Sequence, residues 1–224
     1  PQWKDLGLKD YNKIDIIYGC DFDTVVCDLP YNAQITPFFR IEAPEGLTIK
    51  ICSDNFYVGN TANIRAEYVT TSGEQSYESR GWINGHKVFY IVPHGIEIRE
   101  LKYRETGYNT EFAGSFSCSD PFFNRLWEKA RRTLYVTMRD NYMDCPDRER
   151  AQWIGDMVTE SGETFYALDT KSSLLTRKCL YEFIGWQRPD KVLYAPVPAG
   201  NWKKELPSQS LTAIGFYGLW NYYL

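Results

Sequence analysis

Histidine is scarce in this chain. Its 224 residues include only two histidines, His86 and His94, and both lie in a segment rich in β-forming residues. Catalysis by Ser-His-Asp or Cys-His groups needs a histidine, and transition-metal sites commonly use imidazole ligands. The scarcity therefore argues against those chemistries. If the chain is part of an enzyme, its carboxylates are expected to transfer the protons.

Long apolar runs are also missing. The sequence contains no run of about 18 apolar residues, so it predicts no transmembrane helix and no membrane insertion. Pro1 is not an initiator methionine, and no charged-then-apolar signal segment follows it. The last predicted helix stops abruptly at Leu224. We expect an internal piece of a longer polypeptide, whose remainder would be its partner, and we favour a periplasmic or secreted location over a cytoplasmic one.

Positive charge is not in excess. Lys and Arg number 25 against 29 Asp and Glu, which gives a net charge of −4. A nucleic-acid-binding protein needs positive surface to displace counterions, so this balance argues against nucleic acid as a partner. The six cysteines form no C-x-x-C pair and fit no zinc or haem template. We therefore expect mostly free, buried thiols, no metal and no cofactor.

The sequence changes character near residue 115. Before it, short β-favouring segments alternate with turn signals, a pattern typical of a β-sandwich. The predicted strands are Phe38–Ala43, Leu47–Cys52, Ile64–Thr70, Lys87–Val92 and Ile96–Tyr103. The predicted turns between them are Ser53-Asp54-Asn55, Thr71-Ser72-Gly73, Asn84-Gly85 and His94-Gly95.

After residue 115 the apolar period becomes helical. Asp120 followed by Pro121 predicts a helix start, because a capping side chain and a proline at the first position both favour one. Further helices are predicted over about Glu149–Leu168, over about Thr170–Trp186 with Asp169 as cap, and beyond Ser208, which can cap a fourth. Helices of this length joined by loops imply antiparallel hairpins.

The densely charged segment 144–156 reads DCPDRERAQWIGD. If a helix starts at Glu149, one stripe of its surface contains Trp153, Asp156, Glu160 and Glu163. Such a stripe is typical of a solvated acidic face. It is also what a sugar site needs, namely acceptors for hydroxyls, a carboxyl group with a raised pKa, and an aromatic plate for a ring face. The spacing alone leaves both interpretations open.

Cys145 lies inside the same segment. A phosphatase loop needs an arginine six positions after its cysteine, and here that position is Ala151. We therefore interpret Cys145 as structural. Arg148 and Arg150 flank Glu149, and one of them could hold a neighbouring carboxylate in its ionised form.

The motif Asp144-Cys-Pro-Asp-Arg-Glu-Arg-Ala-Gln-Trp-Ile-Gly-Asp156 resembles the signature of the α-L-rhamnosidases of glycoside hydrolase family 78. The resemblance extends over about residues 96–224. Its further segments are Phe116-Ser-Cys-Ser-Asp-Pro, Asn124-Arg-Leu-Trp, Arg131-Arg-Thr-Leu and Pro207-Ser-Gln-Ser-Leu. In one departure, Glu149 follows Arg148 directly, whereas many members carry an extra acidic residue between the two.

This resemblance implies a multi-domain α and β architecture. An antiparallel β-sandwich over residues 1–114 would precede the N-terminal part of an (α/α)6 toroid over residues 115–224, which is left incomplete. The implied reaction is removal of terminal α-L-rhamnose from a rhamnose-containing carbohydrate with inversion at the anomeric carbon.

The resemblance also implies roles for single residues. Glu149 resembles the general acid. The groups that hold the sugar are implied to be Asp144, Arg148, Asp156 and the pocket aromatic Trp153, with Trp202 as a second aromatic. We expect the pKa of Glu149 to be raised, because two aspartates and a tryptophan surround it. The general base is expected outside this chain.

Two alternatives remain. The chain could be a non-catalytic carbohydrate-binding protein on the same scaffold, or part of a toroid glycosidase for another sugar. The acid at Glu149 favours the enzyme, since a binding protein would be free to lose it.

Overall fold

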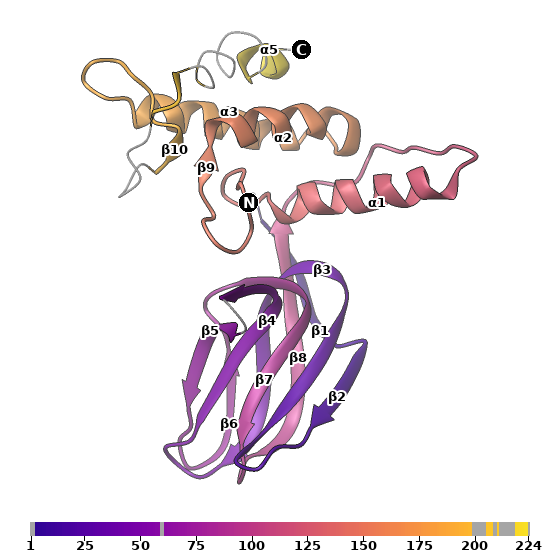
Figure 1. Ribbon diagram of the computed structural model, residues 1–224, viewed down its shortest axis with the longest axis vertical. Helices are drawn as coiled ribbons and strands as arrows, with labels where there is room; N and C mark the ends of the chain where they lie inside the picture. Colours follow the sequence, from indigo (N-terminus) through magenta and orange to yellow (C-terminus); the bar gives the residue numbers. More distant parts are fainter. Residues whose placement is uncertain (1–2, 59–60, 199–204, 208–209, 211–217, 224) are drawn as a thin grey trace. The chain divides into compact units, whose positions relative to one another are not determined.

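The computed structural model describes the chain except for residues 1–2, 59–60, 199–204, 208–209, 211–217 and 224 (Figure 1). The chain divides into two compact units. One consists of Asp5–Thr106, and the other combines Gly107–Leu224 with Pro1–Lys4. Among the described residues, no helix has the length and apolar character needed to cross a membrane.

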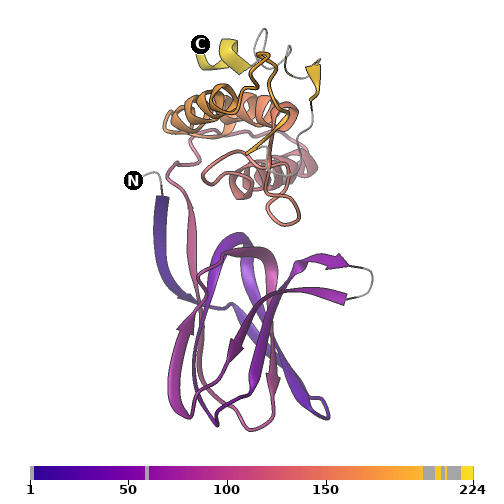
Figure 2. The same ribbon diagram turned by 90° about the vertical axis from the view of Figure 1, so that its left-hand side faces the viewer.

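The first unit is an antiparallel β-sandwich, as predicted (Figure 2). Its strands are β1 (Trp3–Asp10), β2 (Lys13–Ile17), β3 (Phe22–Ala43), β4 (Thr48–Val58), β5 (Thr61–Val69), β6 (Gly73–Glu78), β7 (Ile83–Pro93) and β8 (Glu97–Tyr108), of which β1 and β8 each extend two residues into the other unit. The sequence predicted parts of β3, β4, β5, β7 and β8. It missed β1, β2 and β6, which the structure shows as further paired strands.

Strand β3 organises the sandwich. It is 22 residues long, several times the usual length of a strand. Residues 24–28 pair with β2 on one side and with β7 on the other. Residues 35–42 pair with β8, and residues 38–43 pair with β6. The register of the β3–β7 pairing shifts between Asp28 and Ala33. Strand β7 pairs with β3 on both sides of this irregularity, whereas β2 pairs only with the first half of β3, and β6 and β8 only with the second.

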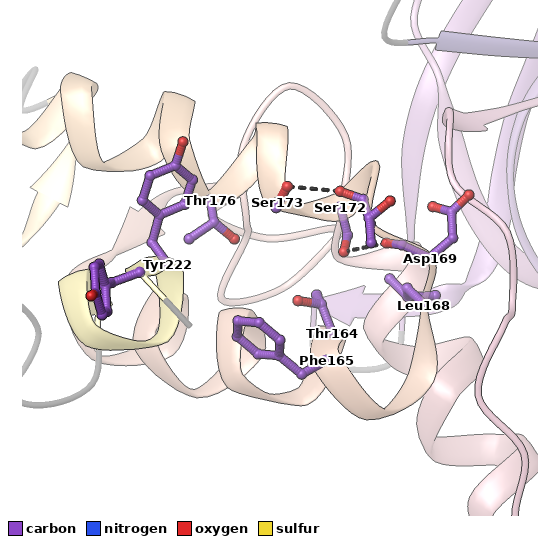
Figure 3. A pocket seen from close by; sticks show the side chains of 10 residues that line it. Thr164, Phe165, Leu168, Asp169, Ser172, Ser173, Thr176 and Tyr222 are labelled. Atoms are coloured by element: carbon purple, nitrogen blue, oxygen red, sulfur yellow. Dashed lines mark hydrogen bonds between the residues drawn. The ribbon is translucent and has the colours of Figure 1, made fainter.

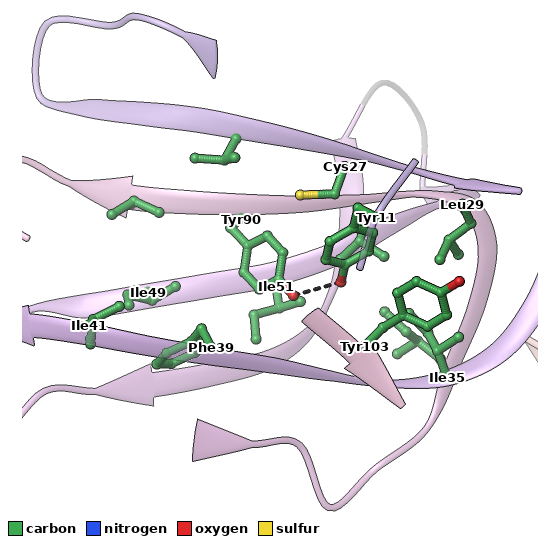
Figure 4. Close-up of a cluster of buried hydrophobic side chains, with 14 of the residues drawn as sticks. Tyr11, Cys27, Leu29, Ile35, Phe39, Ile41, Ile49, Ile51, Tyr90 and Tyr103 are labelled. Atoms are coloured by element: carbon green, nitrogen blue, oxygen red, sulfur yellow. Dashed lines mark hydrogen bonds between the residues drawn. The ribbon is translucent and has the colours of Figure 1, made fainter. Parts of the chain in front are cut away.

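The interior of the sandwich is apolar and well packed. Ile35 and Ile51 are fully buried, and Phe39 is 1% exposed. The hydroxyl groups of Tyr11 and Tyr90 meet inside this core at 2.8 Å, as the dashed line in Figure 4 shows. Each hydroxyl thereby gives the other a hydrogen-bond partner, which burial would otherwise deny it.

Two of the predicted turns are wrong, and contacts of the Asp54 side chain account for both. Ser53-Asp54-Asn55 lies within β4, and Asn84-Gly85 lies within β7. Oδ1 of Asp54 accepts hydrogen bonds from the backbone N–H groups of His86 and Lys87, at 2.8 and 3.0 Å. A Cβ on Gly85 would lie 2.5 Å from that oxygen. The glycine therefore provides room for a side chain of the neighbouring strand instead of forming a turn.

The second unit contains the helical hairpins. Its elements are α1 (Pro121–Val136), β9 (Gln152–Trp153), α2 (Ile154–Ala167), α3 (Ser172–Gly185), β10 (Pro196–Val197) and α5 (Gly218–Tyr223). Helices α2 and α3 pack against each other (Figure 1). The predicted cap is confirmed, because Oδ1 of Asp120 accepts a 2.8 Å hydrogen bond from the N–H of Phe122. Most of the helix predicted beyond Ser208 lies outside the described residues.

The sandwich core predicts a clear contrast between two isoleucines. Ile35→Ala should lower the free energy of unfolding by about 2–5 kcal/mol, because it leaves a cavity in a packed core. Ile16→Ala should change it by less than about 1 kcal/mol, since Ile16 is 48% exposed. Urea unfolding of the two variants measures the difference, and equal losses would contradict the assigned core.

Candidate active site

The helix predicted from Glu149 begins later than expected. Helix α2 starts at Ile154, so Glu149 and Trp153 do not lie on a helical stripe, and this part of the prediction is wrong. Arg150 has a φ of 52°, a left-handed conformation that interrupts a helix. Gln152 and Trp153 instead pair with Val197 and Pro196, and the N–H of Ile154 donates to the carbonyl of Ala195 at 2.8 Å.

The charged segment forms a closed loop before α2. The N–H of Asp144 donates to the carbonyl of Ala151, and the N–H of Ala151 donates back to Oδ1 of Asp144, both at 3.1 Å. These two bonds join the ends of the loop. Inside it, the N–H of Glu149 donates to the sulfur of Cys145 at 3.3 Å. The loop therefore brings the side chains of Asp144 and Glu149 to the same place.

Glu149 has a donor on each of its carboxylate oxygens. Nη2 of Arg148 donates to Oε1 at 2.6 Å, and the indole Nε1–H of Trp153 donates to Oε2 at 2.8 Å. The side chain of Glu149 is 13% exposed, whereas that of Arg148 is 63% exposed. The carboxylate is thus nearly buried, and its arginine partner lies at the surface.

The expectation of a raised pKa at Glu149 is wrong. Desolvation raises the pKa of Glu149, but hydrogen bonds from Trp153, Asp144 and Arg148 outweigh it, and the pKa lies below its ordinary value. The raised pKa belongs to Asp144 instead. Desolvation is the main cause, and the hydrogen bond to Glu149 adds to it. The two carboxyl groups interact as a pair, and their pKa values shift in opposite directions.

Three further carboxyl groups on α2 lie in or near this region. Desolvation, with the charge of Glu149, raises the pKa of Asp156. Desolvation also raises the pKa of Glu163. Glu160 is more deeply placed, and desolvation raises its pKa well above the ordinary value, although a hydrogen bond with Thr137 opposes the shift. Among the described residues, Oε2 of Glu160 has no hydrogen-bond partner.

The structure brings the predicted site residues together. Arg148 and Trp153 donate hydrogen bonds to Glu149, and Asp144 and Asp156 interact with it through charge. Trp153 is half-buried and packs against the core of the helical unit. Trp202 lies outside the described residues. The roles predicted for all these residues stay predictions.

Two features of the site are not visible in the sequence. One is the contact that the sulfur of Cys145, predicted to be structural, makes with the backbone N–H of Glu149. The other is the pairing of β9 with β10, which includes Trp153. A two-residue pairing leaves no periodic signal, so only the fold could reveal it.

A separate pocket lies between α2, α3 and α5. It has a volume of about 300 Å³, and its lining includes Phe165, Thr176 and Tyr222 (Figure 3). No residue of the segment 144–156 is among its lining residues. Within the described part of the chain, the pocket is therefore distinct from the carboxylate cluster. No group of three or more potential metal ligands occurs among the described residues either.

Comparisons with known proteins agree on one family. Residues 111–224, just over half of the chain, match the model of the bacterial alpha-L-rhamnosidase 6 hairpin glycosidase domain. A curated alpha-L-rhamnosidase from Formosa agariphila is 23% identical over 168 residues, which are 66% of this chain and 17% of that protein.

Solved structures show the same fold. The crystal structure of a GH78 family rhamnosidase from Bacillus sp. GL1 has a TM-score of 0.74 at 24% identity, over 88% of this chain and 21% of that one. A rhamnosidase from Klebsiella oxytoca with rhamnose bound has a TM-score of 0.71 at 13% identity, over 88% of this chain and 47% of that one. This chain therefore spans less than half the length of each of these relatives.

Glu160 generates a prediction about stability. Its pKa is higher in the folded state than in the unfolded chain, where it is about 4.3. Its contribution to stability is therefore complete below that pH and is lost as the pH rises through the folded-state pKa. Glu160→Gln cannot ionise, so its free energy of unfolding should fall less over this range. The difference from wild type should grow by up to about 1.4 kcal/mol per pH unit.

Urea unfolding of wild type and variant across this pH range measures the difference. Glu128→Gln is the matched control, because the side chain of Glu128 is 58% exposed. Parallel pH curves for wild type and Glu160→Gln would contradict the assignment of Glu160 as a buried acid.

Proposed function

The chain belongs to the family of bacterial α-L-rhamnosidases with a six-hairpin glycosidase domain, and on that premise we propose that it supplies the general acid of an inverting glycoside hydrolase. The substrate is a carbohydrate that carries a terminal α-L-rhamnose. Glu149 protonates the leaving oxygen. Asp144, Arg148 and Asp156 bind sugar hydroxyls, and Trp153 contributes its ring to the pocket.

The observation that carries this proposal is the carboxyl pair of Asp144 and Glu149. General acid catalysis needs a positioned group that holds a proton near neutral pH. Desolvation raises the pKa of Asp144, so a carboxyl group that keeps its proton to higher pH than an isolated aspartate interacts with Glu149. The exposed guanidinium of Arg148 beside the pair supplies donors suited to hydroxyl groups.

Inversion also needs a base. The base carboxylate of an inverting glycosidase lies about 6.5–9.5 Å from the acid, where it leaves room for a water molecule. On this proposal the base belongs to a part of the complete protein, the parent enzyme, that lies outside residues 1–224. The short share of each relative that this chain covers is consistent with such a division.

Two other functions remain candidates. One is a non-catalytic carbohydrate-binding protein, and the other is a glycosidase for a different sugar. A panel of p-nitrophenyl glycosides separates all three when it is assayed with the parent enzyme. Release of p-nitrophenol from the α-L-rhamnoside alone supports the proposal. Release from another glycoside favours a glycosidase for a different sugar, and rhamnose binding without release favours a non-catalytic binding protein.

Glu149→Gln in the parent enzyme should lower kcat by about 10²–10⁴, the usual contribution of general acid catalysis. The loss should be smaller for a rhamnoside whose leaving group needs no proton. Steady-state kinetics on an activated and an unactivated rhamnoside measure the two losses. Glu128→Gln, the same chemical change at an exposed position of α1, should leave both rates unchanged. Equal losses on both substrates would assign Glu149 to binding rather than to proton transfer.

Residues 1–224 alone should release no p-nitrophenol from the α-L-rhamnoside, because the proposed base lies elsewhere. A purified sample of this chain, assayed beside the parent enzyme, provides the measurement. Activity of the chain alone would place the base within it. Glu160 and Glu163 would then be mutated first, since Glu205 already pairs with Arg188.

A further inference from the structure

Trp153 is fixed beside Glu149 by both its backbone and its ring. Its backbone pairs with Pro196 of β10. The next residue, Ile154, is buried, and its N–H donates to the carbonyl of Ala195 at 2.8 Å. The indole ring of Trp153 packs against the core of the helical unit. The fold therefore sets the position of the indole N–H.

The two oxygens of the Glu149 carboxylate differ in the donor that each contacts. Oε2 accepts the indole N–H of Trp153 at 2.8 Å, and this donor is anchored in the core. Oε1 accepts a hydrogen bond from Nη2 of Arg148 at 2.6 Å, and the side chain of Arg148 is largely exposed. Oε2 is thus held by an anchored donor, whereas the donor on Oε1 lies at the surface.

This difference determines which oxygen is better suited to carry a proton. An indole N–H is a donor only, so it needs Oε2 as an acceptor. A proton on Oε2 would weaken the bond from Trp153, whereas a proton on Oε1 leaves Oε2 as the carbonyl-type acceptor of the indole. A proton on Oε1 displaces Arg148 instead, and water can replace that contact because the side chain is exposed. The acidic proton of Glu149 is therefore expected on Oε1.

We propose that Trp153 is a positioning residue for the general acid: its indole N–H holds Oε2 of Glu149, so that Oε1 is the oxygen that protonates the leaving group. This inference rests on the proposed function and deepens it, because there Trp153 contributes its ring alone. The ring face and the N–H edge are different parts of one side chain, so contact with a sugar and positioning of the acid are compatible.

The bond from Trp153 becomes stronger during the reaction. The O–H bond at Oε1 breaks as the proton passes to the leaving oxygen. The bond from that oxygen to the anomeric carbon breaks, and the water that replaces it gives its proton to the base. The negative charge left on the carboxylate is shared with Oε2, where the indole N–H stabilises it, since hydrogen bonds to ionised acceptors are the strong ones. An interaction that strengthens toward the transition state raises kcat.

The test removes the N–H and keeps the ring. In the parent enzyme, Trp153 is replaced by 3-benzothienylalanine, in which a sulfur atom stands in place of the indole N–H. On a rhamnoside whose leaving group needs a proton, kcat should fall about 10–10²-fold, the contribution of a hydrogen bond to a charged group, and KM should stay unchanged. The loss should be smaller on an activated rhamnoside. Unchanged kcat on both substrates would make Trp153 a plate for the sugar ring alone and would overturn the proposal.

Trp127 provides the matched control. It lies on α1 and packs against the same helical core, and its Nε1 has no hydrogen-bond partner among the described residues. The same replacement at Trp127 should therefore change neither kcat nor KM. Equal losses at Trp127 and Trp153 would report a disturbed core instead of one lost bond, and they would overturn the proposal.

The pH profile adds a readout that contact between the ring and a sugar would not move. Desolvation raises the pKa of Glu149, and the bond from Trp153 is the largest of the interactions that lower it. Loss of that bond should raise the pKa and move the basic limb of kcat/KM, which reports the acid in the free enzyme, to higher pH. The other charged groups that act on this carboxylate are the same in both proteins, namely Asp144, Arg148 and Asp156. An unmoved limb would contradict the positioning role.

A measurement without substrate separates this inference from the proposed function. NMR of the parent enzyme, with ¹⁵N in tryptophan alone, detects the indole N–H groups, and the signal of Trp153 is the one that Trp153→Phe removes. This signal should move with pH as Glu149 titrates, and Glu149→Gln should abolish that movement. Equal movement in Glu149→Gln, or none in the wild type, would overturn the proposal. Absence of rhamnoside hydrolysis would overturn the proposed function and leave the titration of the indole signal standing.

Discussion

The geometry of the candidate site depends on the closed loop between α1 and α2. Its ends are joined by two hydrogen bonds between Asp144 and Ala151, and the pairing of β9 with β10 fixes the residues that follow. Without these constraints the segment could continue α2 toward its N-terminus. Glu149 would then lie on the helix surface, away from the backbone contacts that now orient it.

The loop explains which parts of the site could be predicted. The residue types were visible in the sequence, and the structure brings the five predicted residues together because the motif is short. The conformation was not visible, because the left-handed backbone of Arg150 and the partner strand at Pro196–Val197 carry no periodic signal. The predicted direction of the pKa shift at Glu149 was wrong for a related reason. It depends on the donors that contact the carboxylate, and a sequence does not show them.

The same contrast runs through the fold. The start of α1 was predicted because an N-cap aspartate and a proline act locally. The turns at 53–55 and 84–85 were wrong because Asp54 bonds to the backbone beyond Gly85, a contact between strands distant in sequence. Likewise β3 was predicted only over its last six residues, because its first half is held as a strand by pairing with β2 and β7. Features that depend on neighbouring residues, such as a helix cap, were predictable here. Contacts between elements distant in sequence were not.

The carboxyl pair also changes how Trp153 is understood. An aromatic residue beside acidic groups suggests a plate for a sugar ring, and its half-buried ring is compatible with that role. Its indole N–H, however, is already engaged with Glu149. Trp153 packs against the helical core, so its ring and the carboxylate that its indole N–H holds keep a fixed relation to each other. Under the proposed function, a sugar that contacts this ring or the exposed Arg148 would therefore also affect the acid, because both side chains donate to the carboxylate of Glu149.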